Sequence, residues 1–292
     1  MKVFILGAGK VGRALAAALK KQGTKVTLRP ARKGVPTTRI DASIIVLALR
    51  DRQLPPVAAD LAMSGVVPRS AVVVHNAGAL PAEALDPLRG VCAGIAQMHP
   101  MISFASLRTF PTLTRGHVHV KGEPEAEKRA RALAKKVGMT PRTFANLDTV
   151  GYHAAAGLVA NGAAALAAIG VELLAVSGVP RKEAPKMLGP LLRSVAENVE
   201  ALGFPDALTG PVRRGDAGAI ERQIALLQAR VPEALPLFVA SGLAQLPIAE
   251  QLGDAPKKQL AEVREVLERA LRQSSRSSST PARRPHPRRS RK

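Results

Sequence analysis

Cysteine is nearly absent from this sequence. Cys92 is the single cysteine among 292 residues, so no disulfide can form within the chain. A structural zinc site is disfavoured because a second sulfur ligand is missing, and we expect no bound metal. A lone thiol suits a reducing compartment, so we predict a cytoplasmic protein in which Cys92 is a small buried residue.

Aromatic residues are scarce as well, with no tryptophan, one tyrosine and six phenylalanines. Proteins that bind single-stranded nucleic acids stack bases on aromatic side chains, so this scarcity argues against a dedicated nucleic-acid groove. The net charge of +21 points the other way, but residues 272–292 are rich in arginine, serine and proline and contain no acid. We expect this tail to be disordered and to allow nonspecific contact with nucleic acid or anionic lipid.

Long apolar runs are also rare. Lys10 and Arg13 interrupt the N-terminal segment, so it does not read as a secretion signal. Residues 154–176 have the length of a membrane span and a single charged residue, Glu172. This stretch is mostly alanine and glycine and contains Asn161, so we predict a buried helix in a helical domain and no membrane contact.

The most informative motif that is present lies at the N-terminus. Apolar residues 3–6 run directly into Gly7-Ala8-Gly9-Lys10-Val11-Gly12. Between a strand and a helix, such glycines hold a dinucleotide pyrophosphate: the first makes the turn, the second admits the phosphates, and the third packs the helix on the strand. A strand–turn–helix without a ligand is the alternative, which the second predicted strand at 25–28 disfavours. The predicted cofactor contacts here are Gly7, Ala8, Gly9, Val11 and Gly12.

The residues after the second predicted strand indicate which dinucleotide is bound. An acid about 20 residues beyond the glycines would bind a ribose 2′-hydroxyl, but the sequence there reads Leu28-Arg29-Pro30-Ala31-Arg32-Lys33. Guanidinium groups bind phosphate through charge-assisted hydrogen bonds. Arg29 and Arg32 therefore predict NADP rather than NAD. The alternative is that they are ordinary solvated charges on a basic protein.

The pattern of apolar residues predicts two domains. Short β-branched runs at 42–49 and 71–75 flank a helix-like segment at 55–62, which is typical of buried parallel strands. Further strands are expected near 91–98, 118–121 and 140–144, and a helix at 123–137. We predict an α/β fold with a doubly wound parallel sheet, an NADP-binding Rossmann domain, over residues 1–146. Helical spacing then predicts an all-α domain over residues 147–271, with helices at 152–176, 182–202, 218–229 and 256–271.

Polar residues follow the predicted strands, where ligands of open α/β sheets bind. Asn76 ends one strand and is predicted to face the cofactor, although a simple strand terminus is the alternative. His99, followed by Pro100, can donate a proton to a carbonyl or imine, or can be a satisfied core histidine. His153 and Asn161 are eight residues apart and share roughly one helix face. They complete the candidate catalytic residues, with an interhelical polar contact as the alternative for Asn161.

A loop between two predicted helices, residues 207–216, combines glycines, a hydroxyl, arginines and an acid. Thr209, Arg214 and Asp216 are candidate substrate contacts, because arginine can hold a carboxylate or phosphate. A salt-bridge loop between domains is the alternative. His117 and His119 share one side of a predicted strand, but without a further ligand we interpret them as surface or packing residues.

Together these stretches resemble an uncharacterised bacterial family in which a Rossmann-like domain precedes a helical domain of unknown function. The resemblance covers about residues 1–255. The family that the chain resembles lies within the superfamily of 6-phosphogluconate dehydrogenase-like enzymes, and pyrroline-5-carboxylate reductase and prephenate dehydrogenase are among its relatives. The motifs that carry it are the glycine turn at 7–12, His75-Asn76-Ala77-Gly78, His99-Pro100-Met101, Tyr152-His153 with Asn161, and the loop at 207–216.

The resemblance implies an NADP-binding domain and a helical domain that often forms a homodimer, and it leaves the substrate open. Our interpretation is an NADP-dependent oxidoreductase that transfers hydride between NADP(H) and a small oxo or imino acid. His99-Pro100-Met101 is similar to the His-Pro-Met of prephenate dehydrogenases, which implies a contact between His99 and a small anionic substrate. One departure stands out: hydroxyacid dehydrogenases of the superfamily have a lysine one turn before the helix asparagine, where this chain has Gly157. A noncatalytic NADP-binding sensor or interaction protein is therefore the alternative.

Overall fold

The computed structural model describes residues 1–277, so most of the predicted tail lies outside the described residues. The chain divides into two compact units, residues 1–161 and the residues from Gly162 onward. Helix α4 (Thr149–Val176) contributes residues to both units. The predicted domain boundary at residue 146 falls just before this helix and stays a prediction.

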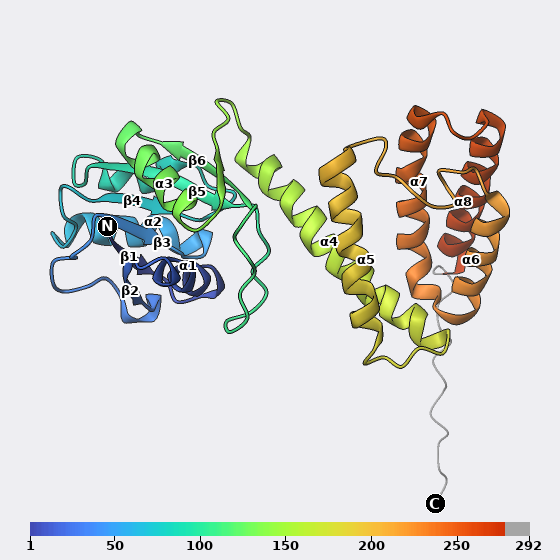
Figure 1. The fold of residues 1–292 in the computed structure, drawn as a ribbon, viewed down its shortest axis with the longest axis horizontal. Helices are drawn as coiled ribbons and strands as arrows, with labels where there is room; N and C mark the ends of the chain where they lie inside the picture. Colours follow the sequence, from blue (N-terminus) through green and yellow to red (C-terminus); the bar gives the residue numbers. More distant parts are fainter. Residues whose placement is uncertain (278–292) are drawn as a thin grey trace, which may run out of the picture. The chain divides into compact units, whose positions relative to one another are not determined.

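The first unit is built on a seven-stranded sheet with the strand order β2-β1-β3-β4-β5-β6-β7 (Figure 1). The strands are β1 (Lys2–Leu6), β2 (Lys25–Arg29), β3 (Ile44–Leu47), β4 (Val72–His75), β5 (Gly94–Pro100), β6 (His117–Gly122) and β7 (Thr140–Arg142). The predicted α/β Rossmann-type fold is confirmed. One pair departs from the parallel prediction: β6 is antiparallel to β5. Their connection contains no helix, and antiparallel neighbours do not need a crossover helix.

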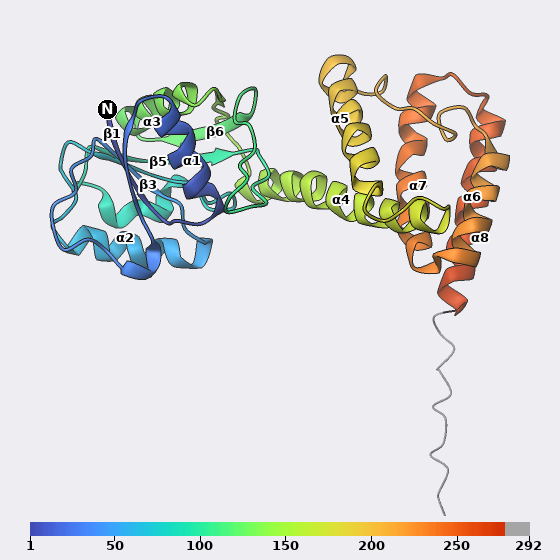
Figure 2. The same ribbon diagram turned by 60° about the horizontal axis from the view of Figure 1, so that its bottom comes forward.

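Helices cover both faces of this sheet. Helices α1 (Lys10–Lys21) and α3 (Pro124–Lys136) lie on one face, and α2 (Leu54–Met63) lies on the other (Figure 2). The central strands are therefore buried on both sides, which explains their uninterrupted apolar sequences. Short 3-10 segments complete the unit: η1 (Ala31–Lys33), η2 (Asp51–Gln53) and η3 (Ala82–Leu88).

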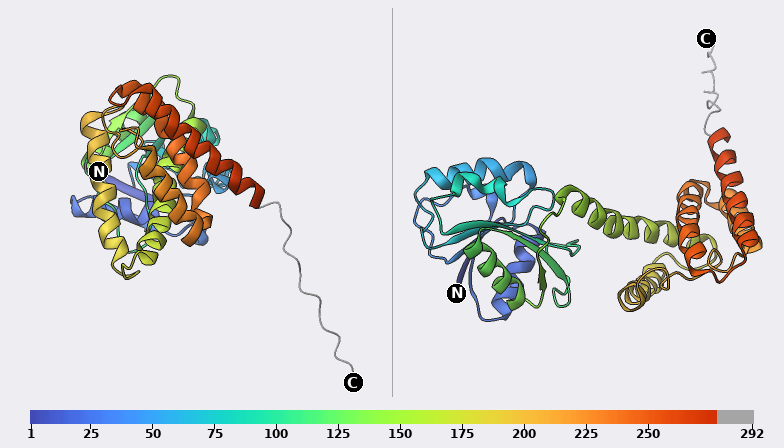
Figure 3. Two further views of the ribbon diagram at one scale, coloured as in Figure 1. Left: turned by 90° about the vertical axis from the view of Figure 1, so that its right-hand side faces the viewer. Right: turned by 90° about the horizontal axis from the view of Figure 1, so that it is seen from above.

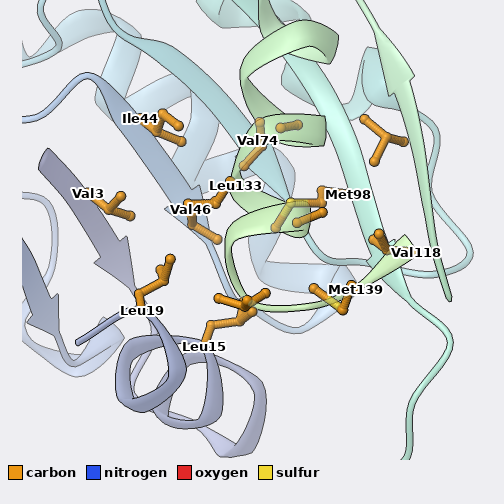
Figure 4. Packing of buried hydrophobic residues seen from close by; sticks show 14 of the residues in the cluster. Val3, Leu15, Leu19, Ile44, Val46, Val74, Met98, Val118, Leu133 and Met139 are labelled. Carbon is orange, nitrogen blue, oxygen red and sulfur yellow. The ribbon is translucent and has the colours of Figure 1, made fainter. Parts of the chain in front are cut away.

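An apolar core lies between the sheet and helices α1 and α3. Val3, Val46, Val74 and Met98 come from four neighbouring strands and pack in one cluster, which Figure 4 shows together with Leu15, Leu19 and Leu133 from the two helices. A second cluster on the opposite face includes Ile45, Leu54, Leu61 and Leu85. Cys92 lies at its margin and is half-buried rather than buried as predicted.

The second unit is helical. It contains α5 (Ala184–Leu202), α6 (Ala217–Arg230), η4 (Pro232–Ala234), α7 (Leu235–Leu252) and α8 (Lys257–Ser277). Helices α6, α7 and α8 lie side by side (Figure 3) and share an apolar core. The four predicted helices correspond to α4, α5, α6 and α8, whereas α7 was not predicted. Helix α8 ends at Ser277, beyond the predicted end at residue 271.

Helix α4 contradicts the prediction that residues 154–176 are buried. None of its residues is buried within the described chain, although it is long and apolar enough to cross a membrane. A single helix of this kind is weak evidence for a membrane span.

Candidate functional site

The glycine turn after β1 is shaped by close backbone packing. Gly7 has φ of 118°, and a Cβ atom there would lie 2.1 Å from the Ala48 carbonyl oxygen. A Cβ on Gly12 would lie 1.9 Å from the Gly7 carbonyl oxygen. Gly9 differs, because nothing lies within 4 Å of its Cβ position. Two of the three glycines are therefore required by the protein's own packing, and the third leaves open space.

A cavity of 290 Å³, the turn cavity, opens beside these glycines. It is lined by Gly7, Ala8 and Gly9 together with the cationic side chains of Arg13, Arg32 and Arg50. The first helical N–H groups of α1 also point toward this region, as in other anion sites at helix N-termini. The cavity therefore combines open backbone with three guanidinium groups, which suits the phosphates of a dinucleotide.

The two predicted 2′-phosphate ligands behave differently. Arg32 lines the turn cavity, whereas Arg29 does not. The Arg29 guanidinium donates to two backbone carbonyls, those of Gly34 at 2.8 Å and Lys33 at 2.6 Å. Arg29 thus holds in place the loop that contains η1, the segment that carries Arg32.

A second cavity of 450 Å³, the Asn76 cavity, shares Gly9, Ala48, Leu49 and Arg50 with the turn cavity. Val11 and Asn76 also line it. The Asn76 amide nitrogen donates to the Met98 carbonyl at 2.5 Å, while Oδ1 is buried without a partner among the described residues. A buried polar atom without a partner is costly. A ribose hydroxyl or a carboxamide N–H would supply it, so these residues fit an NADP molecule that extends from one cavity into the next.

The three predicted catalytic residues meet in a third cavity of 470 Å³, the histidine cavity. His99 comes from the end of β5, and His153 and Asn161 come from the N-terminal half of α4. The two imidazole rings contact edge to face with centroids 5.5 Å apart. Phe104 lines both this cavity and the Asn76 cavity. The candidate catalytic side chains therefore line a cavity that neighbours the Asn76 cavity.

The tautomer of His99 follows from its hydrogen bond. His99 Nδ1 lies 3.0 Å from the Asn76 carbonyl oxygen, and because a carbonyl only accepts, Nδ1 carries the hydrogen. In the neutral ring Nε2 is then the atom that can accept a proton. Burial lowers the pKa of His99; the Asn76 carbonyl partly opposes this and His153 adds to it. At neutral pH His99 is therefore an uncharged imidazole with a free lone pair.

Gly78 allows the two histidines to approach. A Cβ atom at this position would lie 2.3 Å from His153 Nδ1 and 2.7 Å from His99 Cε1. His75, three residues earlier, is a separate case. It accepts from the Ala77 N–H, its Nε2 lies 3.0 Å from the Pro81 carbonyl, and burial lowers its pKa to about 4. His75 is thus a neutral core residue that holds the turn leading to Gly78.

The predicted substrate residues lie in the second unit. Asp216 accepts from the Ala219 N–H and caps helix α6, which accounts for it structurally. Thr209 and Arg214 are exposed. The neighbouring Arg213 bonds to Asp254 and to the carbonyls of Asp206 and Leu208, so it stabilises the loop.

Sequence reasoning missed several cavity residues. Arg13 and Arg50 line the turn cavity, and Phe104 lines both of the other cavities. The position of Arg13, directly after Gly12, was an available signal, because the first turn of the helix faces the bound phosphates. Phe104 lies in the irregular segment between β5 and β6, where no periodicity indicates which side chains point inward. In the described residues no group of His, Cys, Asp or Glu has a metal-binding arrangement.

The middle of the chain matches a known family. The family profile described as "Domain of unknown function (DUF2520)" covers residues 117–244. The DUF2520 match begins at β6 and includes His153 and Asn161, so it contributes two of the three residues that meet at the histidine cavity. Comparison with curated proteins finds no match.

Solved structures share the fold of most of the chain. A protein from Bacteroides fragilis described as a candidate NADP oxidoreductase is 19% identical, with TM-score 0.65, and the alignment covers 84% of this chain and 97% of that one. A protein from Thermotoga maritima is 19% identical, with TM-score 0.62, covering 85% and 98%. Pyrroline carboxylate reductase from Plasmodium falciparum, solved with NADP bound, is 14% identical, with TM-score 0.57, covering 90% and 98%. The resemblance recognised in the sequence is therefore confirmed at the level of fold.

Proposed function

We propose that this protein is an NADP-dependent oxidoreductase that transfers hydride between NADP(H) and a small oxo or imino acid. The observation that supports it best is the overlap in the linings of neighbouring cavities. The turn cavity shares four lining residues with the Asn76 cavity. The Asn76 cavity in turn shares Phe104 with the cavity that holds His99, His153 and Asn161. Similar structures include a reductase solved with NADP bound.

Each part of the site has a proposed role. The glycine turn and Arg13 hold the pyrophosphate, Arg32 holds the 2′-phosphate, and Asn76 Oδ1 accepts a hydrogen bond from the ribose or carboxamide. When bound, NADPH supplies the hydride. His99 or His153 gives a proton to the reduced atom, and Asn161 orients the substrate. Phe104 helps to exclude water from the reacting atoms.

The cofactor assignment predicts that replacing Arg32 weakens the binding of NADPH more than the binding of NADH. Replacing Arg32 by alanine removes one charge-assisted contact to the 2′-phosphate, so NADPH binding should weaken roughly 10- to 100-fold. NADH has no 2′-phosphate, and its binding should change less than threefold or so on the same grounds. Titration of both nucleotides by intrinsic or nicotinamide fluorescence measures the two dissociation constants.

Two variants serve as controls for Arg32. Arg52 is exposed on the neighbouring η2 segment and lines none of the three cavities, so Arg52→Ala should leave both constants unchanged. Arg29→Ala should loosen the loop and weaken both nucleotides together. Equal loss of NADPH and NADH in Arg32→Ala would defeat the phosphate assignment. Binding of NADPH without turnover across a panel of oxo and imino acids would favour a sensor over an enzyme.

We also propose that the protein is a homodimer in which α5 is covered by a second copy. Helix α5 has a stripe of exposed apolar residues at a spacing of four: Met187 (53%), Leu191 (57%), Val195 (48%) and Val199 (39%). Ala184 is its one buried residue. An amphipathic helix gains most of its stability from burying its apolar face. Helix α4, which precedes α5 in the chain, is also apolar and exposed.

The double change Leu191→Glu and Val195→Glu should therefore convert a dimer into a monomer. Two charges in an apolar interface cost several kcal/mol each, which is about a thousandfold or more in the dimer dissociation constant. Light scattering after size exclusion gives the mass directly. Arg193 lies on the opposite face of α5, so Arg193→Glu should leave the dimer intact. A monomeric wild-type protein at micromolar concentration would contradict the proposal.

A further inference from the structure

The lining of the histidine cavity carries no permanent charge in the part of the chain that the structure describes. Its polar members are His99, Ser103, His153 and Asn161; the others are Pro100, Met101, Ile102, Phe104, Ala155, Ala156, Gly157, Val159 and Ala160. We propose that this cavity receives an uncharged, apolar side chain of the oxo or imino acid, an inference that rests on the function proposed above. The substrate is then a monocarboxylate whose acid group is held outside this cavity.

Electrostatics disfavours a second carboxylate here. His153 and Asn161 are themselves exposed, but a carboxylate that gives up part of its hydration against this lining still needs a counter-charge. Burial lowers the pKa of His99, so at pH 7.5 this ring is neutral and gives a carboxylate no positive partner. The hydroxyl of Ser103 and the amide of Asn161 can donate hydrogen bonds, but neither neutralises a charge.

The shape of the cavity suits an aliphatic group. Helix α4 contributes the small residues Ala156, Gly157 and Ala160, and the segment after β5 contributes larger apolar side chains, among them Met101 and Ile102. The volume of 470 Å³ leaves room for several carbon atoms. Each methylene that moves from water into such a surface should improve kcat/KM about fourfold.

Gly157 lines the cavity at a position where a longer, charged side chain would change the charge of the lining. A Cβ atom there would have Asn161 Nδ2, 3.8 Å away, as its nearest neighbour apart from the backbone of its own helix, so the first carbon of a side chain meets no close contact. A lysine at this position would bring an ammonium group beside Asn161. Because the rest of the lining has no Lys or Arg, this one substitution changes the charge of the cavity with little change elsewhere.

A matched pair of substrates tests the inference. 2-Oxopentanoate and 2-oxoglutarate have side chains of similar length that end in a methyl group and a carboxylate, respectively. Calorimetry on the full-length protein with NADP⁺ gives their affinities, and NADPH oxidation gives kcat/KM. We expect 2-oxopentanoate to be preferred by about tenfold or more at pH 7.5, since the second carboxylate lacks a counter-charge. From pyruvate to 2-oxopentanoate, kcat/KM should rise about fourfold per methylene.

Substitutions at Gly157 separate charge from size. Gly157→Lys should reverse the preference, so that 2-oxoglutarate binds more tightly than 2-oxopentanoate. Gly157→Met adds a side chain of similar length without charge and should keep the original preference. Ala154 is exposed on the same helix and does not line the cavity, so Ala154→Lys should change neither affinity. Nucleotide binding should be the same in all three variants.

The outcomes distinguish this inference from the proposed function. Equal or tighter binding of 2-oxoglutarate by the wild-type protein would overturn the inference, as would failure of both acids to bind. If the calorimetric preference is found but NADPH is not oxidised, hydride transfer is wrong and the apolar subsite stands. If NADPH is oxidised with both acids at equal kcat/KM, the enzyme assignment stands and the subsite is wrong.

Discussion

Replacing His99 by alanine should lower kcat by about 100- to 10,000-fold, the range that a general acid or base contributes, while NADPH affinity stays within twofold or so. His99 lines the histidine cavity and neither of the two cavities assigned to the cofactor. The loss should therefore appear in the proton-transfer step and not in nucleotide binding. Stopped-flow measurement of NADPH oxidation together with fluorescence titration separates the two.

The pH dependence should report the same residue. Burial lowers the pKa of His99 below its ordinary 6.5, with His153 adding to the shift and the Asn76 carbonyl and Asp51 opposing it. Reduction needs a proton on Nε2, so its rate should fall as pH rises through that lowered pKa. Oxidation needs the free lone pair of Nε2, so its rate should persist to below pH 6.5 or so before it declines. In His99→Ala this inflection should disappear in both directions.

Histidine controls make the result specific. His117 is exposed near the start of β6 and lies outside the cavity lining, so His117→Ala should behave as the wild-type protein does. His153→Ala tests whether the second ring shares the proton transfer. Full turnover in His99→Ala with its loss in His153→Ala would move the acid from β5 to α4. Full turnover in both variants would show that neither histidine takes part.

The parts of the fold that local chemistry determines were predictable. The glycines at 7–12 and the β-branched runs placed β1 to β4, and helical spacing placed α5 and α6. Helix α7 was missed because Pro247 lies inside it and proline usually ends a helix. The burial of α4 was predicted wrongly because apolar composition says that a helix seeks a partner, not that the same chain supplies it.

In the candidate site, too, some features could be predicted from the local sequence and others could not. His99 and Asn76 follow strands, and the carboxyl ends of parallel strands meet at one edge of a sheet, so sequence reasoning could gather them. Sequence reasoning could not separate the roles of Arg29 and Arg32, because the difference is that Arg29 donates to the backbone carbonyls of Lys33 and Gly34. A guanidinium that satisfies backbone carbonyls and one that faces a phosphate look alike in a sequence.

Gly9 provides the second large effect, because here the fold and the ligand make different demands. Gly9 has φ of −76°, which any residue adopts, and its Cβ position has no neighbour within 4 Å. Gly9→Ala should therefore leave the melting temperature unchanged or slightly higher, since alanine restricts the unfolded chain. A methyl group would stand where the pyrophosphate must approach the backbone, so NADPH affinity should fall about 100-fold or more, roughly 2.7 kcal/mol.

Comparison with two other glycines shows why this result is diagnostic. Gly12→Ala would place a methyl group 1.9 Å from the Gly7 carbonyl oxygen, so it should lower the melting temperature as well as the affinity. Gly162 on α4 has open space at its Cβ position, so Gly162→Ala should change neither affinity nor turnover. A stable Gly9→Ala protein that binds NADPH as tightly as the wild type would mean that no phosphate lies against this turn. The open space at Gly9 would then have no explanation in nucleotide binding, and the roles given to Arg32 and Asn76 would fall with it.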